Sequence, residues 1–141
     1  MPDLKSKILA IIGKPVLGAL ASLTEDGKPW TRYVVPMADQ DLNIRFATFL
    51  GSRKVRQLKA RPEVHLTAGE NTLADMGKPY LQIAGTATVS TDPAEKKAFW
   101  SQGLKAHFSG PDDPNYCVVI IKPSRIEYMT FESMNPEVWT A

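Results

Sequence analysis

The chain has 141 residues, of which 43% are hydrophobic and 23% charged, a composition typical of one globular domain and not of a disordered or membrane-embedded chain. The 17 Lys and Arg residues nearly balance 15 Asp and Glu residues, and the net charge of +2 is too small to indicate a polyanionic partner by itself. No apolar run approaches the roughly 20 residues that span a bilayer, no signal peptide opens the chain, and the single cysteine, Cys117, suits a reducing compartment, so we expect a cytoplasmic protein without membrane association.

Apolar periodicity and turn residues predict a series of short elements within a single domain over residues 1–141. In chain order they are a helix over 3–12, strands over 16–23, 30–37 and 42–48, a helix over 52–60, strands over 64–68 and 79–90, a helix over 93–102, and strands over 116–121 and 125–131.

Particular residues set these boundaries. Asp3, Ser52 and Asp92 are preferred N-cap residues, and each precedes a helical pattern. The Asp-Gly pair in the turn over residues 25–28 is typical of a hairpin. Proline cannot donate to a strand ladder, so Pro123 is expected to separate the last two strands.

The elements predict a mainly β (α+β) fold, with six or seven strands and about three peripheral helices. Because short turns join most successive strands, we expect an antiparallel sheet. Many short strands in one domain favour a barrel or a sandwich, and periodicity alone does not choose between them.

The junction between the third predicted strand and the second predicted helix carries the clearest functional signal. Arg53 and Lys54 stand in the first helical turn, where the partial positive charge of the N-terminus disfavours cations. With the hydroxyls of Thr48 and Ser52 they could converge on one phosphate. Two other interpretations stay open: Ser52 is only a cap on a solvated basic face, or the basic residues bind nucleic acid, although no second basic stretch extends the patch.

Arg32 is the second candidate, since it lies on an otherwise apolar strand. It could meet a ligand phosphate or ring, or it could bond carbonyl groups at the rim of a barrel. His65 and His107 are far apart and have no neighbouring Cys or His, so we expect no metal site. No nucleophile paired with a base is apparent, so no catalytic residue is assigned. Cys117 lies in an apolar run and is expected to be buried.

Three motifs together resemble a known family. Residues 46–54, Phe-Ala-Thr-Phe-Leu-Gly-Ser-Arg-Lys, with 61–64, Arg-Pro-Glu-Val, resemble the phosphate loop of the pyridoxamine 5'-phosphate oxidase-like, FMN-binding split-barrel superfamily. Residues 82–87 resemble its Val-x-Gly-x-Ala strand. Trp100 with residues 108–114, Phe-Ser-Gly-Pro-Asp-Asp-Pro, resembles the general stress protein 26-like branch.

The resemblance implies a split β-barrel that works as a homodimer, with FMN at the subunit interface. The residues that it assigns to the phosphate and the adjoining ribityl chain are Arg32, Thr48, Ser52, Arg53 and Lys54. Those that it assigns to the isoalloxazine ring are Tyr33, Val34 and Val35, through their backbone, and Gln82, which could also reach the ribityl chain.

Departures from the family pattern narrow the expected activity. Met37 stands where the oxidases carry a Lys that holds the substrate, and their closing Arg-x-His segment has no counterpart before Ala141, so oxidation of pyridoxamine phosphate is not expected. We expect an FMN-dependent redox activity with a small-molecule electron donor or acceptor. A non-enzymatic flavin-binding stress protein is the alternative, and a barrel that holds a deazaflavin or haem is a third option. Residues 134–139 are expected to form a tail over the partner's flavin.

Overall fold

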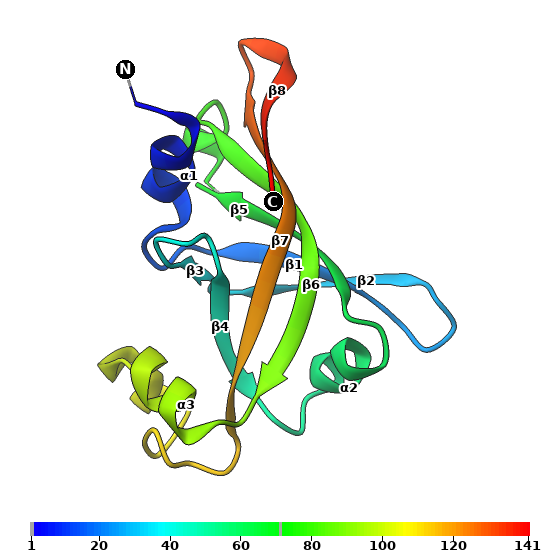
Figure 1. The fold of residues 1–141 in the computed structure, drawn as a ribbon, viewed down its shortest axis with the longest axis vertical. Coiled ribbons are helices and arrows are strands. Elements are labelled where there is room, and N and C mark those ends of the chain that lie inside the picture. Colours follow the sequence, from blue (N-terminus) through cyan, green and yellow to red (C-terminus); the bar gives the residue numbers. More distant parts are fainter. Residues whose placement is uncertain (1, 71) are drawn as a thin grey trace.

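The computed structural model describes residues 2–70 and 72–141 (Figure 1). In chain order its elements are α1 (Leu4–Ile12), β1 (Gly18–Leu23), β2 (Pro29–Val34), β3 (Met37–Ala38), β4 (Ile44–Phe49), α2 (Arg53–Ala60), β5 (Glu63–Gly69), the 3-10 turn η1 (Leu73–Asp75), β6 (Tyr80–Ser90), α3 (Pro93–Phe99), the 3-10 helix η2 (Gln102–Ala106), β7 (Tyr116–Thr130) and β8 (Ser133–Thr140). None of the described helices is long and apolar enough to cross a bilayer.

The described strands form one antiparallel sheet in the order β2-β1-β5-β6-β7-β4-β3, and β8 pairs with β7 beside this path. The long strands β6 and β7 curve through the middle of the molecule, and β1, β2 and β5 cross behind them (Figure 1). Among the described residues no pairing joins β2 to β3, so the curved sheet stays open along one side. The predicted antiparallel split barrel is confirmed, and the two-residue β3 and the C-terminal β8 bring the strands to eight.

The barrel interior holds the main hydrophobic core. It is built from alternate residues of the strands, such as Leu20, Leu66 and Ile83, and from Ile8 and Ile12 of α1, all of them fully buried. The two isoleucines lie one helical turn apart, so α1 presents one apolar face to the sheet. This packing holds the barrel walls in place and leaves the opposite end of the sheet to α2, which contacts β1 and β6 (Figure 1).

A second, smaller core lies outside the barrel under α3 and η2. Phe108, Tyr116 and Val118 are its buried members, and Trp100 packs on the ring of Tyr116 with centroids 5.5 Å apart. The backbone of Trp100 is extended, so the predicted helix over 93–102 ends at Phe99. Packing of the indole on this core ends the helix earlier than its periodicity suggests.

Two of the three predicted caps are confirmed. The Asp3 carboxylate accepts a hydrogen bond from the backbone N–H of Ser6 at 2.8 Å. Asp92 accepts one from the N–H of Ala94 at 3.4 Å, with proline in the first turn. The hairpin turn is also confirmed, because Gly27 has φ +80° and β1 pairs antiparallel with β2 on either side of it.

The predicted break at Pro123 is wrong: β7 runs without interruption through this residue. Gly85 of β6 pairs with Pro123, while Ala84 pairs with Arg125, so Ser124 is an extra residue in a bulge. The missing N–H of the proline therefore falls where the ladder is already irregular. A side chain at Gly85 would place its Cβ 2.6 Å from the carbonyl oxygen of Lys122, so only glycine allows this approach.

Two other predicted strands have shifted limits. The strand expected over 30–37 stops at Val34, and Met37 pairs with Arg45 of β4 as part of β3. The strand expected over 42–48 begins at Ile44, because Leu42 has φ +65° inside a turn.

The expected tail over residues 134–139 is a strand of this chain's own sheet. In β8, Trp139 pairs with Ile126 of β7. The Glu137 carboxylate accepts a hydrogen bond from Lys7 of α1 at 2.8 Å. The segment is thus fixed against both β7 and α1.

Candidate functional site

The turn between β4 and α2 presents two cations at the start of a helix. The backbone N–H of Leu50 donates to the carbonyl of Asn115 at 2.7 Å, and the N–H of Ser52 donates to the carbonyl of Phe49 at 3.0 Å, which fixes the turn. Arg53 and Lys54 then occupy the first turn of α2, where no acidic residue stands. Their charges add to the positive end of the helix dipole.

Ser52 occupies the predicted N-cap position with extended backbone, but its hydroxyl makes no capping hydrogen bond. Its Oγ is buried and has no partner among the described residues. A buried polar atom without a partner costs about 1–3 kcal/mol. The prediction was therefore right about the position of Ser52 and wrong about the bond, which leaves this hydroxyl free for a ligand oxygen.

Lys54 reaches back to the end of β4. Its ammonium donates to Oγ1 of buried Thr48 at 2.8 Å, and its side chain is partly buried. Burial, and then the positive charge of Arg32, lower the pKa of Lys54 below its ordinary 10.5. The two predicted residues of β4 and α2 are thus in direct contact, and the lysine carries a charge that its surroundings do not compensate.

The guanidinium of Arg32 in β2 donates hydrogen bonds to acceptors on β1, β2 and α2. Its Nη1 donates to the carbonyls of Leu20 and Trp30 at 3.1 and 3.2 Å and to Ser22 Oγ at 2.8 Å, and its Nη2 donates to Gln57 Oε1 at 2.7 Å. Burial, and then the positive charge of Arg53, lower the pKa of the guanidinium. Arg32 therefore does bond carbonyls, as one of the two interpretations of the sequence expects, and it also lies beside the cations of α2.

Gln57 and Ser22 are site residues that the sequence analysis missed. Ser22 Oγ donates to Gln57 Oε1 at 2.6 Å, and both side chains are buried. The signal was present, because Ser22 is two residues from Leu20 and so shares its inward face. Gln57 follows Arg53 by one helical turn. Buried and mutually bonded, the two fix the position of Arg32.

The term cationic site is used below for five residues: Arg32, Arg53, Lys54, Thr48 and Ser52. The ion pairs between described residues join Lys7–Glu137, Lys28–Asp26, Arg45–Asp39, Arg45–Glu95, Lys78–Asp75 and Arg125–Glu127, and none includes a member of this site. Three neighbouring cations without a carboxylate repel one another. A phosphate dianion would reverse this, with each charge-assisted hydrogen bond contributing about 1.5–3 kcal/mol.

The residues predicted to contact a ring lie apart from the cationic site. One row of paired residues crosses β2, β1, β5 and β6 on the face away from the core. In that order of strands it consists of Tyr33, Ala19, Thr67 and Gln82. The side chain of Arg32 points to the opposite face, with Leu20. A groove of about 410 Å³ lies on the outer face, and Tyr33, Thr67, Tyr80, Leu73, Met76 and Phe131 are among its lining residues. Gln82 makes no side-chain hydrogen bond to the cationic site within the described chain.

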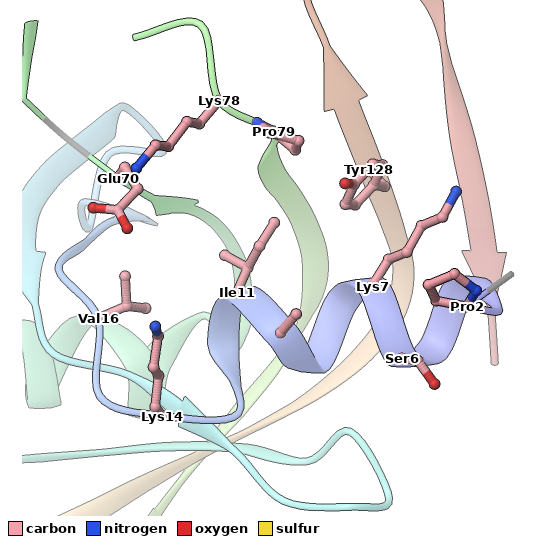
Figure 2. A pocket seen from close by; sticks show the side chains of 11 residues that line it. Pro2, Ser6, Lys7, Ile11, Lys14, Val16, Glu70, Lys78, Pro79 and Tyr128 are labelled. Atoms are coloured by element: carbon pink, nitrogen blue, oxygen red, sulfur yellow. The ribbon is translucent and has the colours of Figure 1, made fainter. Parts of the chain in front are cut away.

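A separate pocket of about 330 Å³ lies between α1 and the ends of β5, β6 and β7 (Figure 2). Figure 2 shows Lys7 and Ile11 of α1 on one side and Tyr128 on the other. Lys7 is paired with Glu137, and Lys78 with Asp75 at 2.9 Å. The pocket contains no residue of the predicted site.

The remaining polar candidates do not form a centre. No group of three or more His, Cys, Asp or Glu residues able to hold a metal ion occurs in residues 2–70 and 72–141. Cys117 is buried, as predicted, and burial raises the pKa of its thiol. Its Sγ donates to the carbonyl of Thr48 at 3.5 Å, so the thiol lies beneath the cationic site and is closed to solvent.

A split antiparallel barrel with a cationic strand–helix turn defines a class, and the comparison with known families identifies it. The chain matches the pyridoxamine 5'-phosphate oxidase family over residues 4–130 and belongs to that family. Within it, the chain is similar to General stress protein 26 of Bacillus subtilis, with 31% identity over 134 residues that cover 95% of this chain and 94% of that protein.

Solved structures agree with this placement. The crystal structure of the General Stress Protein 26 from Bacillus anthracis superposes with a TM-score of 0.84, at 29% identity, and 98% of each chain is covered. A pyridoxamine 5'-phosphate oxidase-related, FMN binding protein from Nostoc punctiforme has a TM-score of 0.68 at 18% identity, covering 87% of this chain and 79% of its own. At that identity the likeness shows the fold alone.

Proposed function

We propose that this protein binds FMN, with the phosphate at the cationic site, and that the bound flavin exchanges electrons with a small molecule. The observation that carries the proposal is the set of three adjacent cations without a carboxylate, beside the unpartnered hydroxyl of Ser52. Membership of the pyridoxamine 5'-phosphate oxidase family supports it, as does the similar fold of the FMN binding protein from Nostoc punctiforme.

Each residue has a distinct part in this proposal. Arg53 and Lys54 hold the phosphate oxygens, and Ser52 donates its free hydroxyl hydrogen to one of them. Thr48 orients the Lys54 ammonium, to which it is bonded at 2.8 Å. Arg32, fixed by Gln57, adds a positive field at the phosphate end. The flavin supplies the electron chemistry when bound, and the chain binds and orients it.

The ring would lie along the outer face of β2, against the backbone of Tyr33, Val34 and Val35 and within reach of Gln82. The side chains of Tyr33 and Val35 are 74% and 56% exposed. A homodimer would cover this apolar edge and enclose the flavin between two copies. Burial of such side chains is favourable by roughly 25 cal/mol per Å² of apolar surface.

The substrate is a small molecule other than pyridoxamine phosphate. Met37, where the oxidases carry a substrate-binding Lys, packs beside β4 and offers no charge to a second phosphate. A reduced nicotinamide is the proposed electron donor, and a quinone, oxygen or small electrophile the acceptor.

The test is a titration of the purified protein with FMN and with riboflavin, followed by the visible spectrum and by quenching of flavin fluorescence. We expect FMN to bind at micromolar concentration and riboflavin to bind much more weakly, because riboflavin lacks the phosphate. Equal affinity for the two flavins would refute the phosphate placement, and failure to bind either would refute the function. Bleaching of the bound flavin by NADH or NADPH under argon then tests the redox activity, and a bound flavin that no donor reduces would indicate a binding protein.

A further inference from the structure

A groove continues from the cationic site along the turn of the β1–β2 hairpin. Its volume is about 340 Å³, and its lining residues are Thr24, Glu25, Asp26, Trp30, Arg53, Arg56 and Gln57. Arg53 belongs to the cationic site, and Gln57 holds Arg32 there. A ligand whose phosphate lies at the start of α2 therefore has open space beyond that phosphate.

The groove carries a further positive charge beyond the cationic site, that of Arg56. Arg56 follows Arg53 by three residues in α2, so the two guanidinium groups lie on the same side of the helix. Arg56 is exposed and takes part in none of the ion pairs between described residues. A second anionic group, one step further along the helix than the first, would meet this arginine.

Trp30 forms a wall that suits a flat ring. The indole is 48% exposed, and the Arg53 guanidinium lies over it at 5.3 Å from the ring centroid. An exposed aromatic side chain gives a base a surface on which to stack. The remaining surface of the indole is open to the groove.

The far end of the groove is acidic. Asp26 accepts a hydrogen bond from the hydroxyl of Thr24 and lies 3.6 Å from the ammonium of Lys28. Glu25 is exposed beside it, and its carbonyl accepts a hydrogen bond from Arg61 at 3.2 Å. Carboxylates at this place would repel a phosphate, but they accept hydrogen bonds from sugar hydroxyls, as acidic residues do in dinucleotide sites.

We propose that this groove binds the adenosine monophosphate half of FAD, so that the protein accepts the dinucleotide as well as FMN. The second phosphate contacts Arg56, the adenine lies on Trp30, and the ribose hydroxyls face the turn carboxylates. The groove thus offers a cation for the phosphate, an aromatic ring for the base and carboxylates for the sugar hydroxyls of this ligand. This inference rests on the proposed placement of the flavin phosphate.

The experiment compares the dissociation constants of FMN and FAD by fluorescence and calorimetry in the wild type and three variants. We expect Arg56→Ala to weaken FAD about fivefold, as loss of an exposed ion pair does, and to leave FMN unchanged. Trp30→Leu should lower the ratio of FAD to FMN affinity about tenfold. The ratio corrects for any effect of this change on Arg53. Lys59→Ala, an exposed cation at the other end of α2, is the control and should change neither ligand.

An unchanged ratio in both groove variants overturns the inference while FMN binding stands. If AMP binds the FMN-saturated protein and Arg56→Ala weakens AMP instead of FAD, the groove serves a separate nucleotide and the inference also fails. If neither flavin binds the wild type, the proposed function falls first and this inference with it.

Discussion

Replacement of Lys54 by methionine tests the cationic site most directly. Methionine keeps the length and the apolar stem of the side chain and removes only the ammonium, so packing against the neighbouring residues is retained. The substitution takes away the hydrogen bond to Thr48 and one of the three positive charges. It should therefore separate a role in binding from a role in folding.

The expected magnitude follows from the surroundings of the ammonium. It is partly buried and lies where burial and Arg32 lower its pKa, so water screens it less than it screens a surface lysine. A charge-assisted hydrogen bond to phosphate in such a place contributes about 1.5–3 kcal/mol, and its loss weakens FMN about 10- to 150-fold. Riboflavin affinity should not change, because riboflavin carries no phosphate.

Fluorescence titrations of both flavins measure this, with Lys59→Met as the matched control on the same helix. A thermal melt of the flavin-free variant adds a second readout. Lys54→Met should melt close to the wild-type temperature, because relief of the repulsion among neighbouring cations offsets the loss of the hydrogen bond to buried Thr48. If FMN affinity is unchanged, or if both flavins lose affinity equally, the phosphate does not lie at the start of α2.

Three further predictions concern titration and folding. FMN affinity should fall as the pH rises through the pKa of Lys54. Because burial and a neighbouring arginine lower this pKa, the fall should begin at a lower pH than for an ordinary lysine. In titrations from pH 7 to 10.5, Lys54→Met should not show this fall in affinity. Gln57→Ala removes the acceptor that two buried or partly buried donors share, and should lower the free energy of unfolding in urea by about 1–3 kcal/mol, whereas an unchanged midpoint would show that water replaces the amide. Gly85→Ala should cost about 1–3 kcal/mol in a thermal melt, because the new Cβ would lie 2.6 Å from the Lys122 carbonyl; Gly110→Ala, where nothing lies within 4 Å, is the control, and equal effects of the two would contradict this reason.

Features could be predicted from the sequence where a local signal and the tertiary structure agree. Asp3 and Asp92 begin their helices as expected, and the turn at Gly27 forms the predicted hairpin. The cations Arg53 and Lys54 were found from their unusual place in the first turn of a helix. Each of these features depends on residues only a few positions apart, which is the range over which a single sequence is informative.

Features that depend on distant residues were not predictable in the same way. Pro123 was expected to end a strand, but the bulge opposite Gly85 accommodates it, and the register of two long strands decides that. The hydroxyl of Ser52 was expected to cap a helix and is left without a partner instead. Ser22 and Gln57 come together only when β1 and α2 pack against each other.

β7 joins both hydrophobic cores and three other strands. Tyr116 and Val118 belong to the core under α3, and Val119, Ile121 and Ile126 belong to the barrel interior. The strand pairs with β4, β6 and β8. Loss of β7 would therefore open both cores at once, which should couple them into one cooperative unfolding unit with its slowest hydrogen exchange at this strand.

The same arrangement governs the order of folding during synthesis. Ile44 of β4 pairs with Ile121 of β7. The edge of β4 that faces β7 therefore stays unpaired until the chain has been synthesised through β7. Such long-range pairing makes folding slow and leaves strand edges exposed in the meantime. The nascent chain would therefore depend on protection from aggregation until β7 has left the ribosome.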